Sequence, residues 1–86
     1  MFEPAIDPSE KALRRMFATA ISKCRKDLDL SQETLAELTD MSTSYISLLE
    51  RGRRNLTVLA ASRIANAYGM KLSDFVALAE TYSTDG

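Results

Sequence analysis

Side chains suited to phosphate binding are concentrated around Gly52. Three arginines and an asparagine lie within three residues of this glycine, at Arg51, Arg53, Arg54 and Asn55. A short basic segment suits a phosphate backbone, because such contacts need positive charge but little geometric precision. The alternative is a run of solvated charges with no ligand. The chemistry that this segment favours is therefore anion binding.

The composition argues against catalysis. The chain contains one cysteine and no histidine, so a disulfide framework and a His/Cys metal cage are excluded, and the commonest general base is missing. It also shows no glycine-rich loop and no acidic pair at a defined spacing. We expect no enzymatic activity and no cofactor.

The overall charge does not indicate nucleic-acid binding, but the distribution of charge along the chain does. The net charge is −1, while the stretch from Lys11 to Leu56 holds nine basic residues against six acidic ones and both ends are acidic. This asymmetry favours one basic face, though weakly.

The 86 residues fit a single domain spanning 1–86, with an expected core over 9–82 and short flexible ends. No apolar run reaches the length of a membrane span and no signal-peptide pattern opens the chain, so we expect a soluble, cytoplasmic protein with no membrane partner.

Caps and hydrophobic periodicity predict five helices and no strand. The first should start at Asp7-Pro8-Ser9-Glu10, with Asp7 as its cap, and end near Asp29. The others are expected at 32–39, 43–51, 58–68 and 74–82, capped by Ser31, Ser42, Thr57 and Ser73 respectively. The inward-facing residues should be Leu13, Phe17, Ala20, Ile21, Cys24, Leu28, Leu35, Ala36, Leu38, Ile46, Leu49, Leu59, Ile64, Ala65, Ala67, Phe75, Leu78 and Tyr82.

Two short helices joined by a brief turn are typical of a helix-turn-helix. The small side chain of Ala36 would let the two helices approach, and Asp40 occupies the turn. The stretch LSQETLAE at 30–37 resembles the "LSQEELAE" opening of the Cro and lambda-repressor-like (Xre) family, and SYISLLERG at 44–52 resembles its "SYISRIERG". The resemblance runs from about Thr19 to Ala79 and implies an all-α, compact five-helix lambda-repressor-like domain whose helix-turn-helix is formed by the second and third helices.

The chain departs from the family at two positions. Asp40 stands where a glycine is usual, and aspartate tolerates positive φ better than most residues. Leu48 replaces a side chain that is often polar or basic. Within the family, Arg54-Asn55-Leu56-Thr57 resembles the "RNxT" stretch of restriction-modification controller proteins. Phage repressors and antitoxins have similar stretches, so the subfamily stays open.

The resemblance implies roles for individual residues. With the third helix in the major groove of DNA, its N-terminal side chains would meet base edges, and Leu48 could touch a thymine methyl group. The alternative is that Thr43 and Ser44 are only favourable first-turn residues. The base-reading candidates are Thr43, Ser44, Ser47 and Leu48.

Further roles concern the DNA backbone and the scaffold. The family's glutamine at the start of the second helix, here Gln32, holds a phosphate, and the alternative is a plain solvated side chain. Tyr45 could stack on the first helix or reach a phosphate. The family also pairs an arginine of the first helix with a glutamate ending the third, which correspond to Arg25 and Glu50. The phosphate-binding candidates are Gln32, Tyr45, Arg51, Arg53, Arg54 and Asn55.

The expected partner is double-stranded DNA, bound by a homodimer at an inverted-repeat operator, because one such domain spans only about half a turn. The apolar residues expected to form the dimer interface are Phe75, Val76, Ala79 and Tyr82. The function expected is transcriptional regulation, and no small-molecule substrate is evident. The alternative is an antitoxin that binds a toxin and autoregulates its operon.

Overall fold

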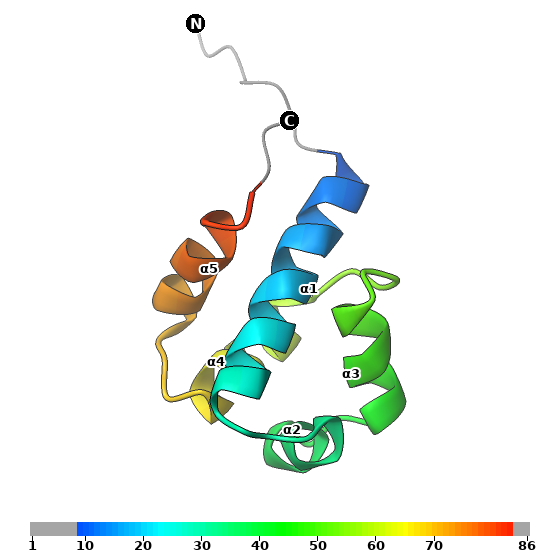
Figure 1. Ribbon diagram of the computed structural model, residues 1–86, viewed down its shortest axis with the longest axis vertical. Coiled ribbons are helices and arrows are strands. Elements are labelled where there is room, and N and C mark those ends of the chain that lie inside the picture. The colour runs from blue at the N-terminus through cyan, green and yellow to red at the C-terminus, as the bar shows by residue number, and fades with distance from the viewer. Residues whose placement is uncertain (1–8, 84–86) are drawn as a thin grey trace, which may run out of the picture.

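The computed structural model describes residues 9–83, and the regular secondary structure within them is entirely α-helical (Figure 1). The helices are α1 (Glu10–Asp27), α2 (Gln32–Thr39), α3 (Thr43–Glu50), α4 (Val58–Ala67) and α5 (Leu72–Glu80). The predicted all-α class and the order of five helices are confirmed. No helix in this part of the chain is both long enough and apolar enough to cross a membrane.

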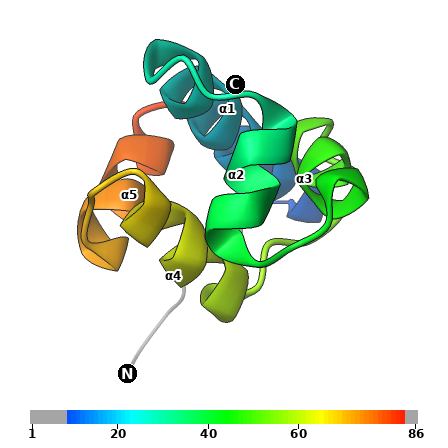
Figure 2. The same cartoon turned by 90° about the horizontal axis from the view of Figure 1, so that it is seen from below.

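The five helices are arranged as a closed ring of contacts. The long helix α1 packs on α3 and α5, the short α2 packs on α3 and α4, and the ring closes where α4 meets α5. Viewed along α1, α2 lies between α3 and α4 (Figure 2). Because α3 packs on α1 and α2 without being enclosed by them, part of its surface is left to solvent.

One hydrophobic core fills the ring. Its largest fully buried side chains include Phe75, Ile21, Leu35 and Ile46, which come from four different helices. Phe75 lies at its centre, with its ring 6.1 Å from that of Phe17. A residue buried this completely contributes about 1.5–3 kcal/mol to folding, so Phe75 is a principal link between α5 and α1.

Serine and threonine hydroxyls cap the starts of the first four helices. The side chains of Ser9, Ser31, Ser42 and Thr57 each accept a hydrogen bond from the backbone N–H three residues on, which satisfies one orphan donor per helix. The first cap is Ser9 rather than the predicted Asp7, which lies outside the described residues, as does Pro8. The fifth helix starts two residues earlier than predicted: Lys71 is its N-cap, without a side-chain bond, and Ser73 is inside it.

Four of the helices end in the same way. The residues following them, Asp29, Asp40, Gly52 and Gly69, have positive φ. At each end, the next N–H donates back to a carbonyl five residues earlier, as in the bond from Met41 to Ala36 at 3.0 Å. This is the Schellman arrangement, which satisfies carbonyls that the helix leaves free. The positive φ of 55° at Asp40 confirms that aspartate occupies the left-handed turn position.

Several expected core residues lie on the surface. Leu38 is 58% exposed and Leu59 is 62% exposed, while Leu13 and Leu28 are 40% and 49% exposed. Leu38 and Leu59 point outward because each short helix has only one narrow face toward the core, which Leu35 with Ala36 and Ala60 with Ile64 already fill. Apolar character alone does not decide burial in so small a domain.

Candidate nucleic-acid interface

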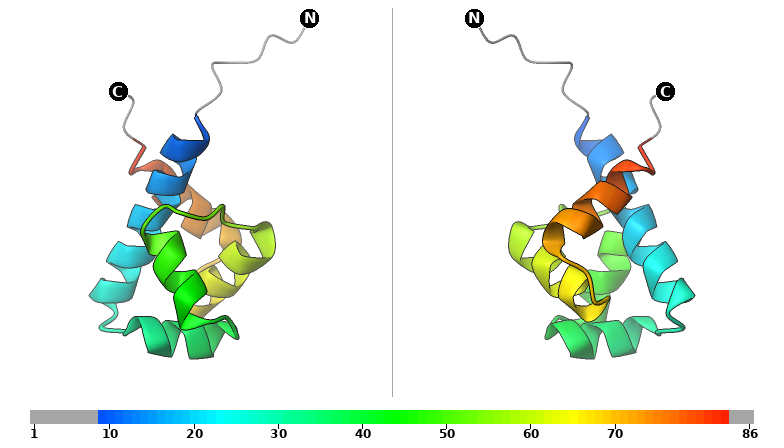
Figure 3. Two further views of the ribbon diagram at one scale, coloured as in Figure 1. Left: turned by 90° about the vertical axis from the view of Figure 1, so that its right-hand side faces the viewer. Right: turned by 90° about the vertical axis from the view of Figure 1, so that its left-hand side faces the viewer.

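The exposed face of α3 gathers the side chains predicted to read bases. In the left-hand view of Figure 3, α3 lies in front of the rest of the molecule with α2 below it. A shallow hollow of about 400 Å³ opens on this side of the two helices. Its lining comprises all four base-reading candidates and two phosphate-binding candidates, namely Thr43, Ser44, Ser47, Leu48, Gln32 and Arg51.

The capping of α3 leaves its first-turn hydroxyls available. Ser42 forms the cap, since its Oγ accepts a hydrogen bond from the Tyr45 N–H at 3.1 Å. Thr43 and Ser44 are exposed, and within the described residues their hydroxyls make no hydrogen bond. They are therefore free to bond an external group, whereas Ser47 and Leu48 are half-buried and form the floor of the hollow.

Behind this face, Arg25 of α1 and Glu50 of α3 form a two-pronged ion pair. Arg25 Nε lies 2.6 Å from Glu50 Oε2, and the second guanidinium nitrogen lies 2.9 Å from Oε1. The side chains are only 12% and 7% exposed. The third guanidinium nitrogen donates to the Leu30 carbonyl at 2.8 Å. Arg25 thus fixes the end of α3 against both α1 and the loop that leads into α2.

Gln32 joins the same cluster. Its Nε2 donates to Glu50 Oε1 at 3.0 Å, so the start of α2 is tied to the end of α3. The hydrogen bonds that Arg25 donates to the Glu50 carboxylate raise the pKa of Arg25 above its usual value, so the guanidinium stays charged and balances the carboxylate. Gln32 is therefore bonded to the scaffold in the free protein, while it also lines the hollow beside α3.

The segment after α3 presents its arginines outward. Gly52 has φ +68° and its N–H donates to the Leu49 carbonyl at 3.1 Å, while the Arg53 N–H donates to the Leu48 carbonyl at 2.9 Å. This arrangement turns the chain away from the axis of α3. Arg51, Arg53 and Arg54 are all exposed, so three positive charges flank the end of the helix.

Tyr45 lies toward α4 rather than α1. It is half-buried and lines a small hollow with Thr57, Leu59 and Arg63. The guanidinium carbon of Arg54 lies 5.7 Å from the centre of the Tyr45 ring, which is a cation–π distance. The Tyr45 ring thus contacts the basic segment through Arg54.

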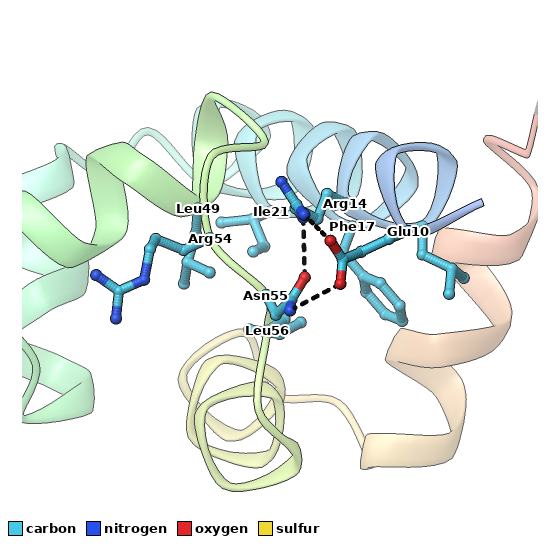
Figure 4. A pocket seen from close by; sticks show the side chains of 9 residues that line it. Glu10, Arg14, Phe17, Ile21, Leu49, Arg54, Asn55 and Leu56 are labelled. Carbon is cyan, nitrogen blue, oxygen red and sulfur yellow. Dashed lines mark hydrogen bonds and ion pairs between the residues drawn. The ribbon is translucent and has the colours of Figure 1, made fainter.

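Asn55 is engaged with α1. Its Oδ1 accepts a hydrogen bond from Arg14 Nε at 2.9 Å, and its Nδ2 lies 3.4 Å from Glu10 Oε1 (Figure 4). Arg14 is also paired with Glu10, one helical turn away. Sequence reasoning missed Glu10 and Arg14: their four-residue spacing signals a pair on one helix face, but nothing local signals Asn55, which is 41 residues from Arg14.

The structure removes two residues from the expected dimer patch. Phe75 and Ala79 are 0% exposed and belong to the core of a single chain, because α5 turns this side toward α1 and α4. Val76 and Tyr82 are half-buried and retain some accessible surface. The Lys23 ammonium lies 5.9 Å from the centre of the Tyr82 ring, so this tyrosine also contacts α1.

Comparison with known proteins identifies the arrangement. The family model HTH_3, described as helix-turn-helix, matches residues 21–75, which include α2, α3 and the basic segment. The chain belongs to this helix-turn-helix family. The HTH_3 chain is 36% identical to the control protein C.MunI of Mycoplasma sp over 59 residues, covering 67% of the chain and 80% of the relative.

Solved structures agree with this assignment. The restriction-modification controller protein C.AhdI from Aeromonas hydrophila superposes with a TM-score of 0.69 at 31% identity, covering 72% of this chain and 94% of the controller. The clp gene regulator ClgR from C. glutamicum superposes with a TM-score of 0.79 at 26% identity, covering 93% of this chain and all of the regulator (100%). This HTH_3 protein is therefore a transcriptional regulator with a helix-turn-helix DNA-binding domain, related to restriction-modification controllers, and not an enzyme.

Proposed function

We propose that the protein binds an inverted-repeat operator as a homodimer, with α3 of each subunit in the major groove. The observation that carries this proposal is the hollow on the exposed face of α3, where Thr43, Ser44, Ser47 and Leu48 lie beside Gln32 and Arg51. An α-helix with its side chains is about 10–12 Å across, which matches the width of the major groove, about 12 Å.

In this proposal, some residues of this face contact base edges and others contact the phosphate backbone. The hydroxyls of Thr43 and Ser44 contact base edges, and Leu48 packs on a thymine methyl group. Arg51, Arg53 and Arg54 neutralise phosphates, and Gln32 exchanges or supplements its bond to Glu50 with a phosphate contact. Serine and threonine are weaker readers than arginine or asparagine, so DNA shape and bending supply part of the specificity.

The similarity to C.MunI and C.AhdI supports a role in controlling transcription of a restriction-modification operon. In a homodimer, two copies of α3 would enter successive major grooves about 34 Å apart. The accessible parts of Val76 on α5 and of Tyr82, in the turn after α5, are the proposed contacts between subunits.

Selection of duplexes from a random DNA library tests the proposal. We expect enrichment of an inverted repeat whose half-sites lie about one helical turn apart. On that site, six arginines from two subunits should make affinity fall on the order of 10³-fold between about 50 and 200 mM salt. Failure to enrich any sequence, or an affinity that hardly changes with salt, would contradict operator binding.

The assignment of a reader is tested by Thr43→Ala. This change should weaken binding to the selected site by about 1 kcal/mol and leave binding to a scrambled duplex unchanged. Equal weakening on both duplexes would show that Thr43 does not read bases.

A further inference from the structure

The segment between α3 and α4 lies outside the face of α3 that carries the base-reading candidates. Arg53 and Arg54 lie between two points at which this segment contacts the rest of the domain. At one point, a Cβ atom on Gly52 would lie 3.9 Å from the Arg14 carbonyl carbon, so the two backbones are close. At the other, Asn55 is bonded by the side chain of Arg14, and the following Leu56 packs against the core.

The second contact is made by polar side chains, because the segment crosses an open cleft at this point. The cleft has a volume of about 520 Å³ and an apolar floor that includes Leu13, Phe17 and Leu49. Figure 4 shows Glu10, Arg14 and Asn55 joined across its mouth, while the Arg54 side chain points away from it. Side-chain packing does not fill this space, so the three hydrogen-bonded side chains hold this stretch of the backbone together with the packing of Leu56.

We infer that Glu10, Arg14 and Asn55 form a clamp that positions Arg53 and Arg54 for the DNA backbone. The inference rests on the proposed function and gives Asn55 a different role from the phosphate ligand expected from sequence. Both arginines are exposed, and their stretch is also held by the Arg53 N–H bond to the Leu48 carbonyl and by the contact of Arg54 with the Tyr45 ring. The clamp adds side-chain hydrogen bonds from α1 at Asn55, directly after the two arginines. Order imposed before binding lowers the entropy lost when the phosphate contacts form.

The clamp makes an unusual prediction for Glu10. Removing a negative charge near a DNA-binding surface should strengthen binding by simple electrostatics. Because Glu10 holds both Arg14 and Asn55, Glu10→Ala should instead weaken binding to a mixed-sequence duplex, by about three- to ten-fold, and lower the salt slope by about 1–2 per subunit. Glu10→Gln keeps an acceptor oxygen and should bind close to the parent.

Asp74→Ala is the matched control. Asp74 is an exposed acid in the first turn of α5, on a helix that does not contribute to the cleft. Asp74→Ala removes the same charge from the same kind of helix position as Glu10→Ala, but away from the clamp. It should therefore leave the salt slope unchanged. If Glu10→Ala and Asp74→Ala behave alike on DNA, or if Glu10→Ala lowers only the melting temperature, the clamp is refuted.

A second comparison separates positioning from direct contact by Asn55. Asn55→Ala should reduce affinity and slope in the parent, but should add nothing in a variant that already carries Arg53→Gln and Arg54→Gln, because coupled residues are not additive. An equal further loss in that background would show that Asn55 itself binds DNA. A parent that binds with a flat salt dependence would instead overturn the proposed function, which keeps the two failures distinct.

Discussion

At the scale of single residues, Arg25 is the side chain on which most local contacts converge. Its guanidinium bonds Glu50 twice and the Leu30 carbonyl once, and Glu50 in turn accepts from Gln32. Three helices and one loop therefore meet at two nearly buried side chains. A cluster of this kind stabilises geometry through complete hydrogen bonding more than through net charge attraction.

We expect Arg25→Ala to destabilise the fold by about 3–5 kcal/mol, because it leaves the Glu50 carboxylate buried without its counter-charge. It should also weaken specific and non-specific DNA binding together, since Glu50 would then repel phosphate. Arg14→Ala is the control: it breaks an ion pair with Glu10 whose side chains are 28% and 65% exposed, so its cost should stay below about 1 kcal/mol. Urea denaturation compares the stability of both variants. Duplex binding is compared between Arg25→Ala and the parent, because Arg14 belongs to the proposed clamp. Similar stabilities for the two variants would contradict the role of Arg25.

Tyr68 is a second residue whose surroundings have a measurable consequence. Its hydroxyl donates to the Ile21 carbonyl at 2.7 Å, and its ring packs 6.3 Å from that of Phe75. Burial raises the pKa of Tyr68 above its usual value, aided by the Cys24 thiolate that forms at alkaline pH and by the Glu50 carboxylate.

The raised pKa of Tyr68 predicts alkaline destabilisation. Above about pH 10 an unfolded tyrosine ionises while folded Tyr68 keeps its proton, so the unfolded state binds fewer protons and the free energy of unfolding falls by up to about 1.4 kcal/mol per pH unit. Tyr68→Phe should be less stable near neutrality by about 0.5–1.5 kcal/mol through its lost hydrogen bond, yet lose less stability between about pH 9 and 11. Parallel pH profiles for parent and variant would rule out this contribution.

At the scale of elements, the turn between α2 and α3 sets the geometry of the helix-turn-helix. Asp40 has φ 55°, and the Met41 N–H returns to the Ala36 carbonyl at 3.0 Å. An L-residue in this conformation is strained by about 1–2 kcal/mol, whereas glycine is not. The chain therefore tolerates strain in the turn that joins its two DNA-binding helices.

Asp40→Gly should stabilise the domain by about 0.5–1 kcal/mol, because the relief of strain outweighs the greater freedom of glycine in the unfolded state. Asp40→Ala should have the opposite sign, since alanine lacks the local polar interactions that let aspartate adopt positive φ. Thermal melting of the two variants beside the parent decides the matter. A loss of stability in Asp40→Gly would mean that the aspartate side chain stabilises the turn.

Local sequence patterns predicted where the helices lie better than they predicted which helix residues are buried. Serine and threonine caps located the starts of α2, α3 and α4 to the residue, because a cap acts on its own helix. The start of α5 was misplaced because Ser73 has the right residue type, while the helix begins without a side-chain cap. Leu59 was misplaced because burial depends on which face a neighbouring helix covers.

The candidate site shows the same difference between local features, which the sequence predicts, and long-range contacts, which it does not. The motifs of α2 and α3 brought Gln32, Thr43 and Ser44 to one face, and the Arg25–Glu50 pair followed from a family resemblance. The attachment of Asn55 to α1 could not be predicted, because it depends on the path of the segment over the cleft rather than on any local pattern. Long-range polar contacts become visible only when the fold is known.

At the scale of the whole molecule, α5 combines two roles along its length. Phe75 and Ala79 face inward and are fully buried, while the neighbouring Val76 retains accessible surface. The same helix thus closes the core and is the proposed contact with a second subunit.

The two roles predict different outcomes for adjacent substitutions. Phe75→Asp should abolish the helical fold, because a charge would replace a completely buried aromatic ring, whose truncation to alanine alone would cost about 3–5 kcal/mol. Val76→Asp should retain far-UV helicity but shift the protein to monomer and weaken operator binding. Circular dichroism and sedimentation distinguish the cases. A dimer that survives Val76→Asp would place the subunit contact on another surface.

The closed ring of helix contacts also bears on how the chain is made. During synthesis α1 emerges before either of its partners, and its contact with α5 must wait until residues near Phe75 have been added. Until then the side of α1 that carries Phe17 lacks the cover that Phe75 provides, so the nascent chain exposes apolar surface until α5 has been synthesised. Premature termination anywhere before α5 should therefore yield a chaperone or protease substrate rather than a smaller working repressor or activator.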